Sequence, residues 1–291
     1  MATKLGTLYL IATPIGNLED ISLRALRILR QVARIACEDT RQTAKLLHHY
    51  EISTPTLAFH QFNEHRVLQG LIRRLQSGED LALVTDGGTP VISDPGFTLV
   101  RAASESSIPI VPVPGASALL TALIVSGLPA DRFLFLGFLP HRSSDRQKLF
   151  QELRERKETL VFFDSPRRVR RSLEEMAALL GDRRAVLCRE MTKLHEEFQR
   201  GRLRDLASGM ESRVVRGEIT LVVEGAGEVQ LEPGAEPDIR SAVEAEIGRG
   251  LTHRDAVRNV AKRFALPRRH VYRLSRPDFS GKARTASSEE E

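Results

Sequence analysis

Short apolar runs alternate with segments of helical periodicity along the first part of the chain. The runs at residues 6–12, 81–85 and 108–113 have the length of buried strands. Residues 97–106 predict a helix between the last two runs, and residues 20–34 predict another with Asp20 as its N-cap. This alternation favours an α/β fold with a parallel sheet covered on both faces.

Apolar runs continue in the second part of the chain at closer spacing, which favours a mixed sheet there. The PVPG sequence near residue 113 indicates a domain boundary, and the Pro- and Glu-rich segment 232–238 indicates a linker. We therefore predict two α/β domains, a small C-terminal helical unit and a disordered tail, over residues 1–113, 114–231, 238–276 and 280–291. The predicted strands are 133–137, 159–163, 185–189 and 218–224, and the predicted helices are 145–157 and 167–180.

Charge is concentrated near the C-terminus. The 291 residues have a formal net charge of +5, whereas residues 251–284 alone have a net charge of +8 and the rest of the chain is close to neutral. Such a segment suits the binding of a polyanion, although a solvated helix face has the same composition.

Within that segment, Thr252 suits the N-cap of one helix and Pro267 the start of a second. The pair has the outline of a helix–turn–helix with basic residues on its exposed sides. A second basic cluster follows Pro166, where a solvated first helical turn is the alternative interpretation. The candidate residues for binding a polyanion such as RNA are Arg167, Arg168, Arg258, Lys262, Arg268, Arg269 and Arg273.

Cysteine content and hydropathy indicate a soluble cytoplasmic protein without a membrane partner. The two cysteines, Cys37 and Cys188, cannot form a disulfide framework, and their surroundings lack metal-ligand spacing, so no metal site is predicted. No apolar run reaches the roughly 18 residues that a membrane-spanning helix needs.

Three loops rich in Gly and Pro follow predicted strands, at residues 12–17, 85–96 and 114–118. Ligands of open α/β sheets bind beyond the carboxyl ends of the strands, so three such loops predict a ligand cleft. The sequence has no GxGxxG fingerprint, no P-loop and no GxSxG nucleophile elbow, which argues against those three kinds of site.

Seven short motifs together resemble the tetrapyrrole-methylase superfamily, and within it the enzymes that methylate small-subunit ribosomal RNA. The resemblance covers about residues 5–276. The motifs are ATPIGN (12–17), EDTR (38–41), TDGGTPVISDPG (85–96), PGASA (114–118), FFDSP (162–166), REMTK (189–193) and GE (217–218).

The resemblance implies two α/β domains of tetrapyrrole-methylase type, with S-adenosylmethionine held in the cleft between them. It also implies a homodimer and 2′-O-methylation of a cytidine in the decoding region of 16S rRNA within the small ribosomal subunit. By motif position, the cofactor-binding residues are Pro14, Asp86, Thr89, Ile92, Ser117, Ala118, Phe163, Met191 and Thr220.

The polar residues of the matched motifs are the candidates for catalysis. Glu38, Asp39, Arg41 and Lys193, together with Glu190, are of the types that can move a proton or orient a hydroxyl group. The sequence does not choose between them, and helix capping or ion pairing would use the same residues.

Two other functions remain open at this stage. The cofactor loops do not identify the acceptor, so a tetrapyrrole or another small molecule is one alternative. A nonenzymatic helix–turn–helix protein that binds nucleic acid is the other. The basic unit 238–276 separates the first alternative from an rRNA methyltransferase, since a small-molecule enzyme has no need of it.

Overall fold

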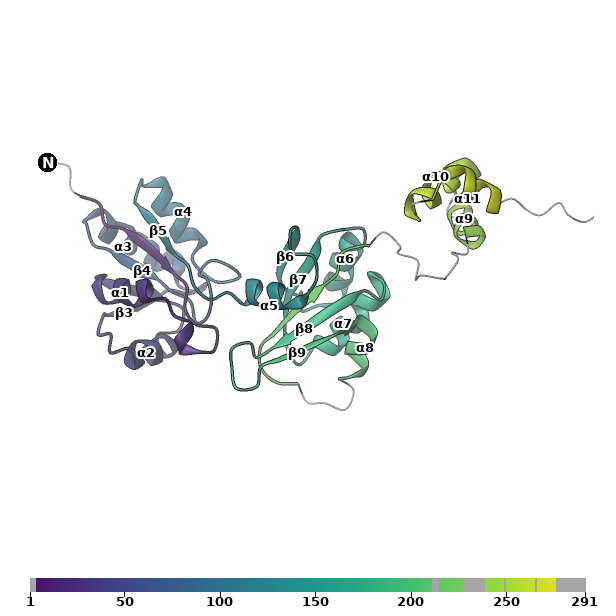
Figure 1. Cartoon of the computed structure of the whole chain (residues 1–291). Coiled ribbons are helices and arrows are strands. Elements are labelled where there is room, and N and C mark those ends of the chain that lie inside the picture. Colours follow the sequence, from purple (N-terminus) through teal and green to yellow (C-terminus); the bar gives the residue numbers. More distant parts are fainter. Residues whose placement is uncertain (1–3, 211–214, 228–238, 249, 265, 276–291) are drawn as a thin grey trace, which may run out of the picture. The chain divides into compact units, whose positions relative to one another are not determined.

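The computed structural model describes residues 4–210, 215–227, 239–248, 250–264 and 266–275. The chain divides after Ala226 into two compact units (Figure 1). The predicted linker 232–238 and the predicted tail 280–291 lie outside the described residues.

The first lobe of the N-terminal unit is built on a five-stranded parallel sheet with the strand order β3-β2-β4-β1-β5. One hydrophobic cluster packs under α1 and α2, and another packs under α3 and α4, so helices cover both faces of the sheet. The strands are β1 (Leu8–Ile11), β2 (Arg34–Cys37), β3 (Thr56–Ala58), β4 (Leu81–Leu83) and β5 (Ile110–Val113). The helices are η1 (Leu18–Asp20), α1 (Leu23–Gln31), α2 (Thr40–His49), α3 (Glu64–Gln76) and α4 (Phe97–Glu105).

The predicted helix 20–34 is wrong at both ends. The Oγ of Ser22, not Asp20, caps α1 by accepting the Ala25 N–H at 3.1 Å, and Asp20 closes the preceding 3-10 turn. Val32 ends the helix, and Arg34 already begins strand β2. The apolar residues of β2 continue the helical run of α1 without a Gly or Pro between them, so periodicity alone merges the two elements.

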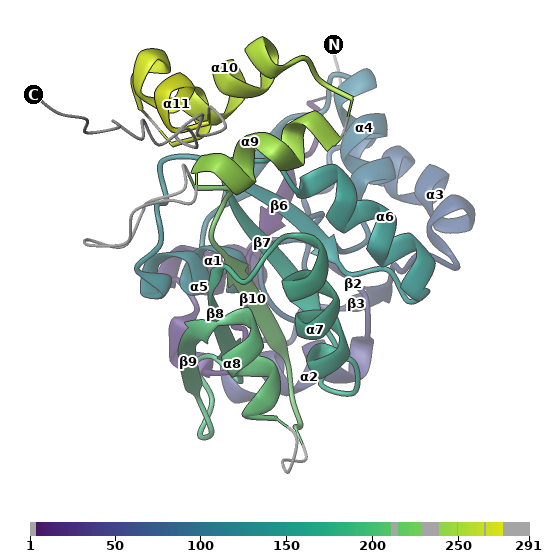
Figure 2. The ribbon, with the colours of Figure 1, turned by 90° about the vertical axis from the view of Figure 1, so that its right-hand side faces the viewer.

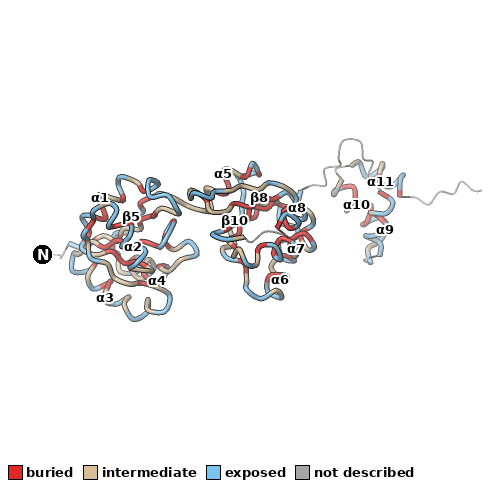
Figure 3. The backbone as a smooth tube through the Cα atoms, turned by 90° about the horizontal axis from the view of Figure 1, so that it is seen from below, coloured by how far each residue is buried: buried red, intermediate tan, exposed pale blue. Residues whose placement is uncertain are grey.

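The second lobe is built on a mixed sheet with the order β6-β7-β10-β8-β9, in which only β6 and β7 are parallel. Three helices, α6, α7 and α8, pack on one face, and α5 packs on the other (Figure 2). Figure 3 shows that the buried residues lie inside each lobe, along the strands and the inner sides of the helices. The strands are β6 (Phe133–Phe138), β7 (Thr159–Asp164), β8 (Arg184–Arg189), β9 (Glu197–Arg202) and β10 (Ile219–Val223). The helices are α5 (Ala118–Ser126), α6 (Ser143–Leu153), α7 (Val169–Leu179) and α8 (Leu203–Ser208).

The C-terminal unit consists of three short helices around a small apolar core. These are α9 (Ile239–Gly248), α10 (His253–Arg263) and α11 (Arg268–Leu274). Val243, Val260 and Val271 meet in the core. The Oγ1 of Thr252 caps α10 by accepting the Asp255 N–H at 3.2 Å, as the sequence predicts. Within the described residues of both units, no helix combines the length and apolarity that crossing a membrane requires.

Candidate functional site

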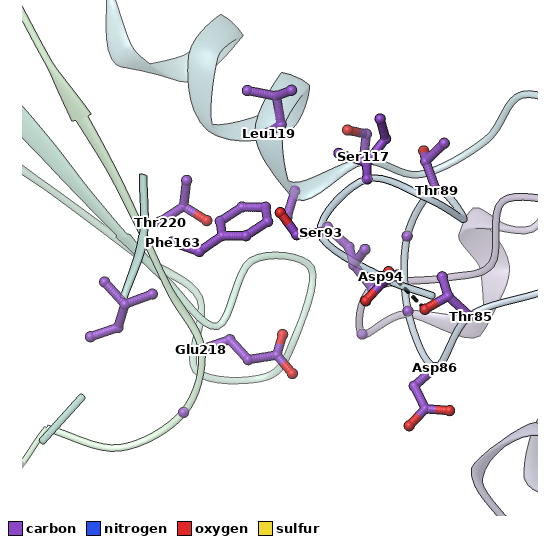
Figure 4. A pocket seen from close by; sticks show the side chains of 18 of the residues that line it. Thr85, Asp86, Thr89, Ser93, Asp94, Ser117, Leu119, Phe163, Glu218 and Thr220 are labelled. Atoms are coloured by element: carbon purple, nitrogen blue, oxygen red, sulfur yellow. Dashed lines mark hydrogen bonds between the residues drawn. The ribbon is translucent and has the colours of Figure 1, made fainter. Parts of the chain in front are cut away.

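A cleft of about 690 Å³ lies in the N-terminal unit, lined by loops from both sheets (Figure 4). On the first sheet, these loops follow the carboxyl ends of β1, β4 and β5. On the second sheet, β10 runs antiparallel to β7 and β8, so its first residues lie beside the last residues of both. The strand ends of the two sheets therefore meet at one place, which is where α/β folds bind ligands.

The loop 85–96 forms most of the wall on the first lobe and is fixed by its own hydrogen bonds. Thr13 and Gly88 exchange two backbone hydrogen bonds of 2.9 Å, which tie this loop to the loop after β1. The Thr85 hydroxyl donates to Asp94 Oδ2 at 2.7 Å. Val91 and Ser93 have φ values of 76° and 63°, a left-handed conformation that non-glycine residues adopt only when their surroundings impose it. The loop is thus rigid before any ligand binds.

Carboxylates gather at this wall. Asp86 Oδ1 accepts the backbone N–H of Asp39 at 3.0 Å, which brings the Glu38–Asp39 segment beside the loop. Burial raises the pKa of Glu38, and the nearby charges of Asp94, Asp86 and Asp39 raise it further. Burial also raises the pKa of Asp94, where the hydrogen bond from Thr85 opposes the shift and the charge of Asp86 adds to it. This wall is therefore electrically negative and suits a cationic ligand.

The side chains of Asp39 and Arg41 form an ion pair with each other. Asp39 caps α2 by accepting the Arg41 N–H at 2.8 Å, and its carboxylate also accepts the guanidinium of Arg41. These bonds hold the pKa of Asp39 at about 2. The cap therefore keeps its charge across the neutral pH range.

Lys193 lies at the opposite wall, between two carboxylates. Its Nζ is 3.0 Å from Glu190 Oε1 and 3.2 Å from Glu218 Oε2. Burial lowers the pKa of Lys193, but Glu190 and Glu218 outweigh that effect and the net shift is upward. Lys193 is thus an ammonium ion at neutral pH.

Close backbone approaches set the position of this lysine. A Cβ on Gly217 would collide with the Glu190 carboxylate, and a Cβ on Gly16 would collide with Lys193 Cγ. Gly16 belongs to the loop after β1 and Lys193 to the loop after β8. The two glycines therefore let loops of both lobes approach the side chains of Lys193 and its partner Glu190 closely.

Apolar side chains form the part of the cleft nearest to α5. Figure 4 shows Phe163 beside Thr220, and Leu119 on α5 also lines the cleft. Ser117 caps α5 by accepting the Leu120 N–H, which places the start of this helix at the cleft. A planar aromatic group or an aliphatic chain can pack on these side chains, with polar loop atoms beside it.

The cleft brings together eight of the nine predicted cofactor-binding residues and one catalytic candidate. Met191 is absent from the lining and is buried in the core cluster beneath α5. Lys193 lines the cleft, whereas Glu38, Asp39 and Arg41 are absent from its lining, and the backbone of Asp39 binds Asp86. The eight are Pro14, Asp86, Thr89, Ile92, Ser117, Ala118, Phe163 and Thr220.

The predicted RNA-binding arginines differ in their surroundings. Arg167 is exposed beside the cleft-lining Pro166, but Arg168 turns inward and binds Asp164 Oδ1 at 2.9 Å. In the C-terminal unit, a groove of about 470 Å³ is bordered by Arg258, Lys262 and Arg268. Arg269 and Arg273 are exposed on α11 of the same unit.

Sequence reasoning missed Phe138 and Leu119, which also line the cleft. Both are apolar residues just beyond a predicted strand (133–137) and a predicted loop (114–118), so no local pattern separates them from core positions. Among the described residues, no group of three or more His, Cys, Asp or Glu is arranged to hold a metal ion.

The geometry defines a two-lobed α/β protein with a ligand cleft at its strand ends, and comparison with known proteins gives its family. The family model of the tetrapyrrole (corrin/porphyrin) methylases matches residues 7–207. The chain belongs to this family, and its predicted fold class is confirmed. The methyl donor of the family is S-adenosylmethionine.

Curated relatives share most of the chain. A protein of Halalkalibacterium halodurans named ribosomal RNA small subunit methyltransferase I is 43% identical over 275 residues, 92% of this chain and 94% of the relative. A protein of Synechocystis sp. with the same name is 43% identical over 93% of this chain and 98% of its own length.

A solved structure of diphthine synthase has the same fold. It is 16% identical, with a TM-score of 0.62, and the match covers 76% of this chain and 90% of that one.

The residues of the cleft fit S-adenosylmethionine. This molecule carries an adenine ring and two cationic centres, a sulfonium and an ammonium group. Phe163 and Leu119 offer apolar packing for the ring, and Asp86 and Asp94 offer carboxylates to cations and hydroxyl groups. The cleft volume lies within the usual range of small-molecule sites, about 300–1,000 Å³.

Proposed function

We propose that this chain transfers a methyl group from S-adenosylmethionine to the ribose 2′-oxygen of a cytidine in the decoding region of 16S rRNA. The likeness to the rRNA methyltransferases carries this proposal. It extends over 92–93% of the chain and so includes residues beyond Ala226, where the basic unit lies. The match to diphthine synthase covers only 76% of the chain.

The chemistry needs an aligned acceptor and a place for its proton. When bound, S-adenosylmethionine supplies an electrophilic methyl group. The chain has to orient the ribose hydroxyl group, exclude water and help the poorly acidic hydroxyl to lose its proton.

One catalytic candidate lines the cleft and suits these roles. Lys193 stays charged beside Glu190 and Glu218, so it serves to stabilise negative charge on the acceptor oxygen and not as a base. Glu38 has a raised pKa but lies outside the cleft lining, so it acts on the site only through its charge beside Asp86 and Asp94. The side chains of Asp39 and Arg41 are occupied with each other and serve the cap of α2.

The basic C-terminal unit would hold the rRNA. Arg258, Lys262 and Arg268 around one groove suit phosphate contacts, which give affinity that falls with salt. The homodimer implied by the family resemblance stays a prediction.

The test is transfer of labelled methyl groups from S-adenosylmethionine to 30S subunits from a strain that lacks this protein. We expect label on the ribose of one cytidine, located by mass spectrometry after digestion. Subunits from the parent strain are the matched control and should take up no label, because their site is already modified. Label on a base, or none despite tight cofactor binding, would contradict the proposal. In the second case a tetrapyrrole or other small molecule would be tested next as the acceptor.

A further inference from the structure

One aromatic ring of the cleft is open to solvent. Phe138 is the last residue of β6 and lines the cleft, yet 63% of its surface is exposed. Phe163, by comparison, is half-buried. The exposed ring therefore adds an apolar surface to the wall of the cleft.

A β-bulge gives Phe138 this position. In the pairing of β6 with β7, Phe135 lies opposite Val161 but Phe138 lies opposite Phe163, so one extra residue is inserted in β6. Gly137 within the bulge has a φ of 65°, which a glycine adopts without strain. Such bulges re-aim a side chain and are frequent next to active sites. The backbone is thus specialised to place this ring.

The ring also has a fixed support. Phe163 contacts Phe138 edge-on, with ring centroids 5.3 Å apart and an interplanar angle of 61°. A Cβ on Gly137 would lie 3.1 Å from Ser93 Oγ, so the loop of the first lobe closes over the bulge. Because both neighbours are held, Phe138 offers a flat apolar surface that needs little ordering when a ligand binds.

Basic groups lie on the segments that follow Phe138 and Phe163. Arg168 links the segment after Phe138 to the loop after β7, since its guanidinium binds His141 Nδ1 at 2.9 Å and the Leu139 carbonyl at 3.3 Å. Arg142 and Arg167 flank this link and are exposed, and within the described part of the chain neither side chain has a hydrogen bond or an ion pair. Exposed guanidinium groups on the segments that adjoin an aromatic ring suit a nucleotide, with its base on the ring and its phosphates on the arginines.

We propose that Phe138 is the platform on which the base of the acceptor nucleotide stacks after it leaves its RNA helix. The proposal rests on the proposed rRNA substrate and adds the residue that orients the acceptor. A base taken out of its stack loses its neighbours, and an aromatic side chain replaces part of that interaction. With the base held on Phe138, the attached ribose is kept at the cleft.

The test compares Phe138→Ala, Phe138→Leu, Phe138→Tyr and Phe138→Trp in methyl transfer to unmodified 30S subunits. Loss of one stacking contact predicts a fall of roughly 10- to 100-fold in kcat/KM for Phe138→Ala. Phe138→Leu should stay low because it restores only apolar volume, whereas the Tyr and Trp variants should be close to the native protein. The affinity for S-adenosylhomocysteine, measured by calorimetry, should be the same in all of them.

Phe62→Ala is the matched control, because Phe62 is 88% exposed outside the cleft lining, and it should leave kcat/KM unchanged.

A second readout does not depend on methyl transfer. The chain contains no tryptophan, so Phe138→Trp introduces a single indole at the proposed platform. Titration with oligocytidylate should quench its fluorescence, and Phe62→Trp should show no such response. Quenching without any transfer of label to 30S subunits by the native protein would overturn the proposed substrate but keep the platform.

Three results would overturn the platform itself. The first is equal methyl transfer by Phe138→Leu and Phe138→Tyr, which would show that any apolar side chain suffices and that no base stacks there. The second is a loss of S-adenosylhomocysteine affinity in Phe138→Ala, which would place the ring at the methyl donor. The third is an active native protein whose Phe138→Trp variant gives no quenching.

Discussion

The residues that surround Lys193 have left-handed backbone conformations. Glu190 and Thr192 have φ values of 51° and 65°, and Gly217, which faces the Glu190 carboxylate, has a φ of 91°. Glu190 Oε1 accepts both the Lys193 ammonium group and the backbone N–H of Glu218. The position of the Lys193 ammonium group thus depends on these left-handed backbone conformations as well as on the Glu190 side chain.

Gly217→Ala tests that dependence. The substitution adds a Cβ where the Glu190 carboxylate lies and imposes a left-handed φ on alanine. We expect a loss of about 1–3 kcal/mol in stability and a drop of at least tenfold in methyl transfer, because Lys193 loses its partner. Urea unfolding and single-turnover transfer measure the two effects.

Gly70→Ala is the matched control for Gly217→Ala. Gly70 lies within α3, and a Cβ there would meet nothing within 4 Å. We expect unchanged transfer and a gain of roughly 0.5–1 kcal/mol from the better helix propensity of alanine. Equal stability and equal methyl transfer in the two variants would refute the idea that Gly217 and Glu190 fix the position of Lys193.

The raised pKa of Glu38 predicts a pH dependence of stability. Folding favours the protonated form of a carboxyl group whose pKa is raised, so ionisation of Glu38 costs stability as the pH increases above about 4.5. Glu38→Gln should therefore raise Tm at pH 7, and the gain should shrink toward pH 4. Thermal unfolding between pH 4 and 7 measures it. Glu152→Gln, on the exposed side of α6, is the control, and a similar gain there would contradict the local origin of the effect.

At the scale of residues, the sequence predicts which loops form the cleft but not which contacts their side chains make. The Gly and Pro loops and their polar residues mark the cleft because special backbone conformations need those residues. Nothing in the sequence distinguishes Arg167, which is exposed, from Arg168, which turns to a buried aspartate four residues earlier. Likewise, the exposure of Phe138 depends on a bulge that appears only once β6 pairs with β7.

At the scale of elements, a buried ion pair joins α6 to α7. Arg146 is almost fully buried; its Nε is 2.9 Å from Glu175 Oε2, and its Nη1 donates to the carbonyls of Pro140 and His141. Ser143 and Arg171 also bind Glu175. This cluster fixes the segment that follows Phe138, and with it one edge of the cleft.

Arg146→Ala should destabilise the protein by about 3–5 kcal/mol, since it leaves the mostly buried Glu175 carboxylate with fewer partners. Arg101→Ala removes a comparable pair with Glu105 on α4, but both side chains there are more than 60% exposed. That variant should change stability by less than about 1 kcal/mol. Urea unfolding of both proteins measures the contrast, and equal losses would show that burial does not decide the effect.

Long and strongly patterned elements were the easiest to predict. Helices α4, α6 and α7 and strands β7 and β8 lie within one or two residues of the predicted ranges at most of their ends, because apolar periodicity and turn residues bound them. The three-residue strand β3 and the helices α2 and α3 were missed. Their stability depends on packing against the parallel sheet, and α2 and α3 bury only one narrow face each.

At the scale of the whole molecule, the two units contain different candidate binding surfaces. The N-terminal unit contains the complete cleft, and the C-terminal unit contains the groove lined by Arg258, Lys262 and Arg268. The uneven charge along the sequence predicts this separation. It does not predict which basic side chains share a groove, because that depends on how α10 and α11 pack.

The separation predicts that rRNA affinity and cofactor affinity can be changed independently. In the full-length chain, Lys262→Ala with Arg268→Ala should weaken binding to 30S subunits and leave the affinity for S-adenosylhomocysteine unchanged. Each lost phosphate contact lowers the slope of log K against log salt by about 0.7–0.9, so the double variant should lose roughly 1.4–1.8. Arg240→Ala is the control within the same unit, because Arg240 pairs with Glu244 on α9 away from the groove lining. A slope that falls equally in the control would mean that the unit attracts RNA through its overall charge. An unchanged slope in the double variant would remove the groove from the RNA-binding surface, and the exposed arginines on the segments that follow Phe138 and Phe163 would then be the next contacts to test.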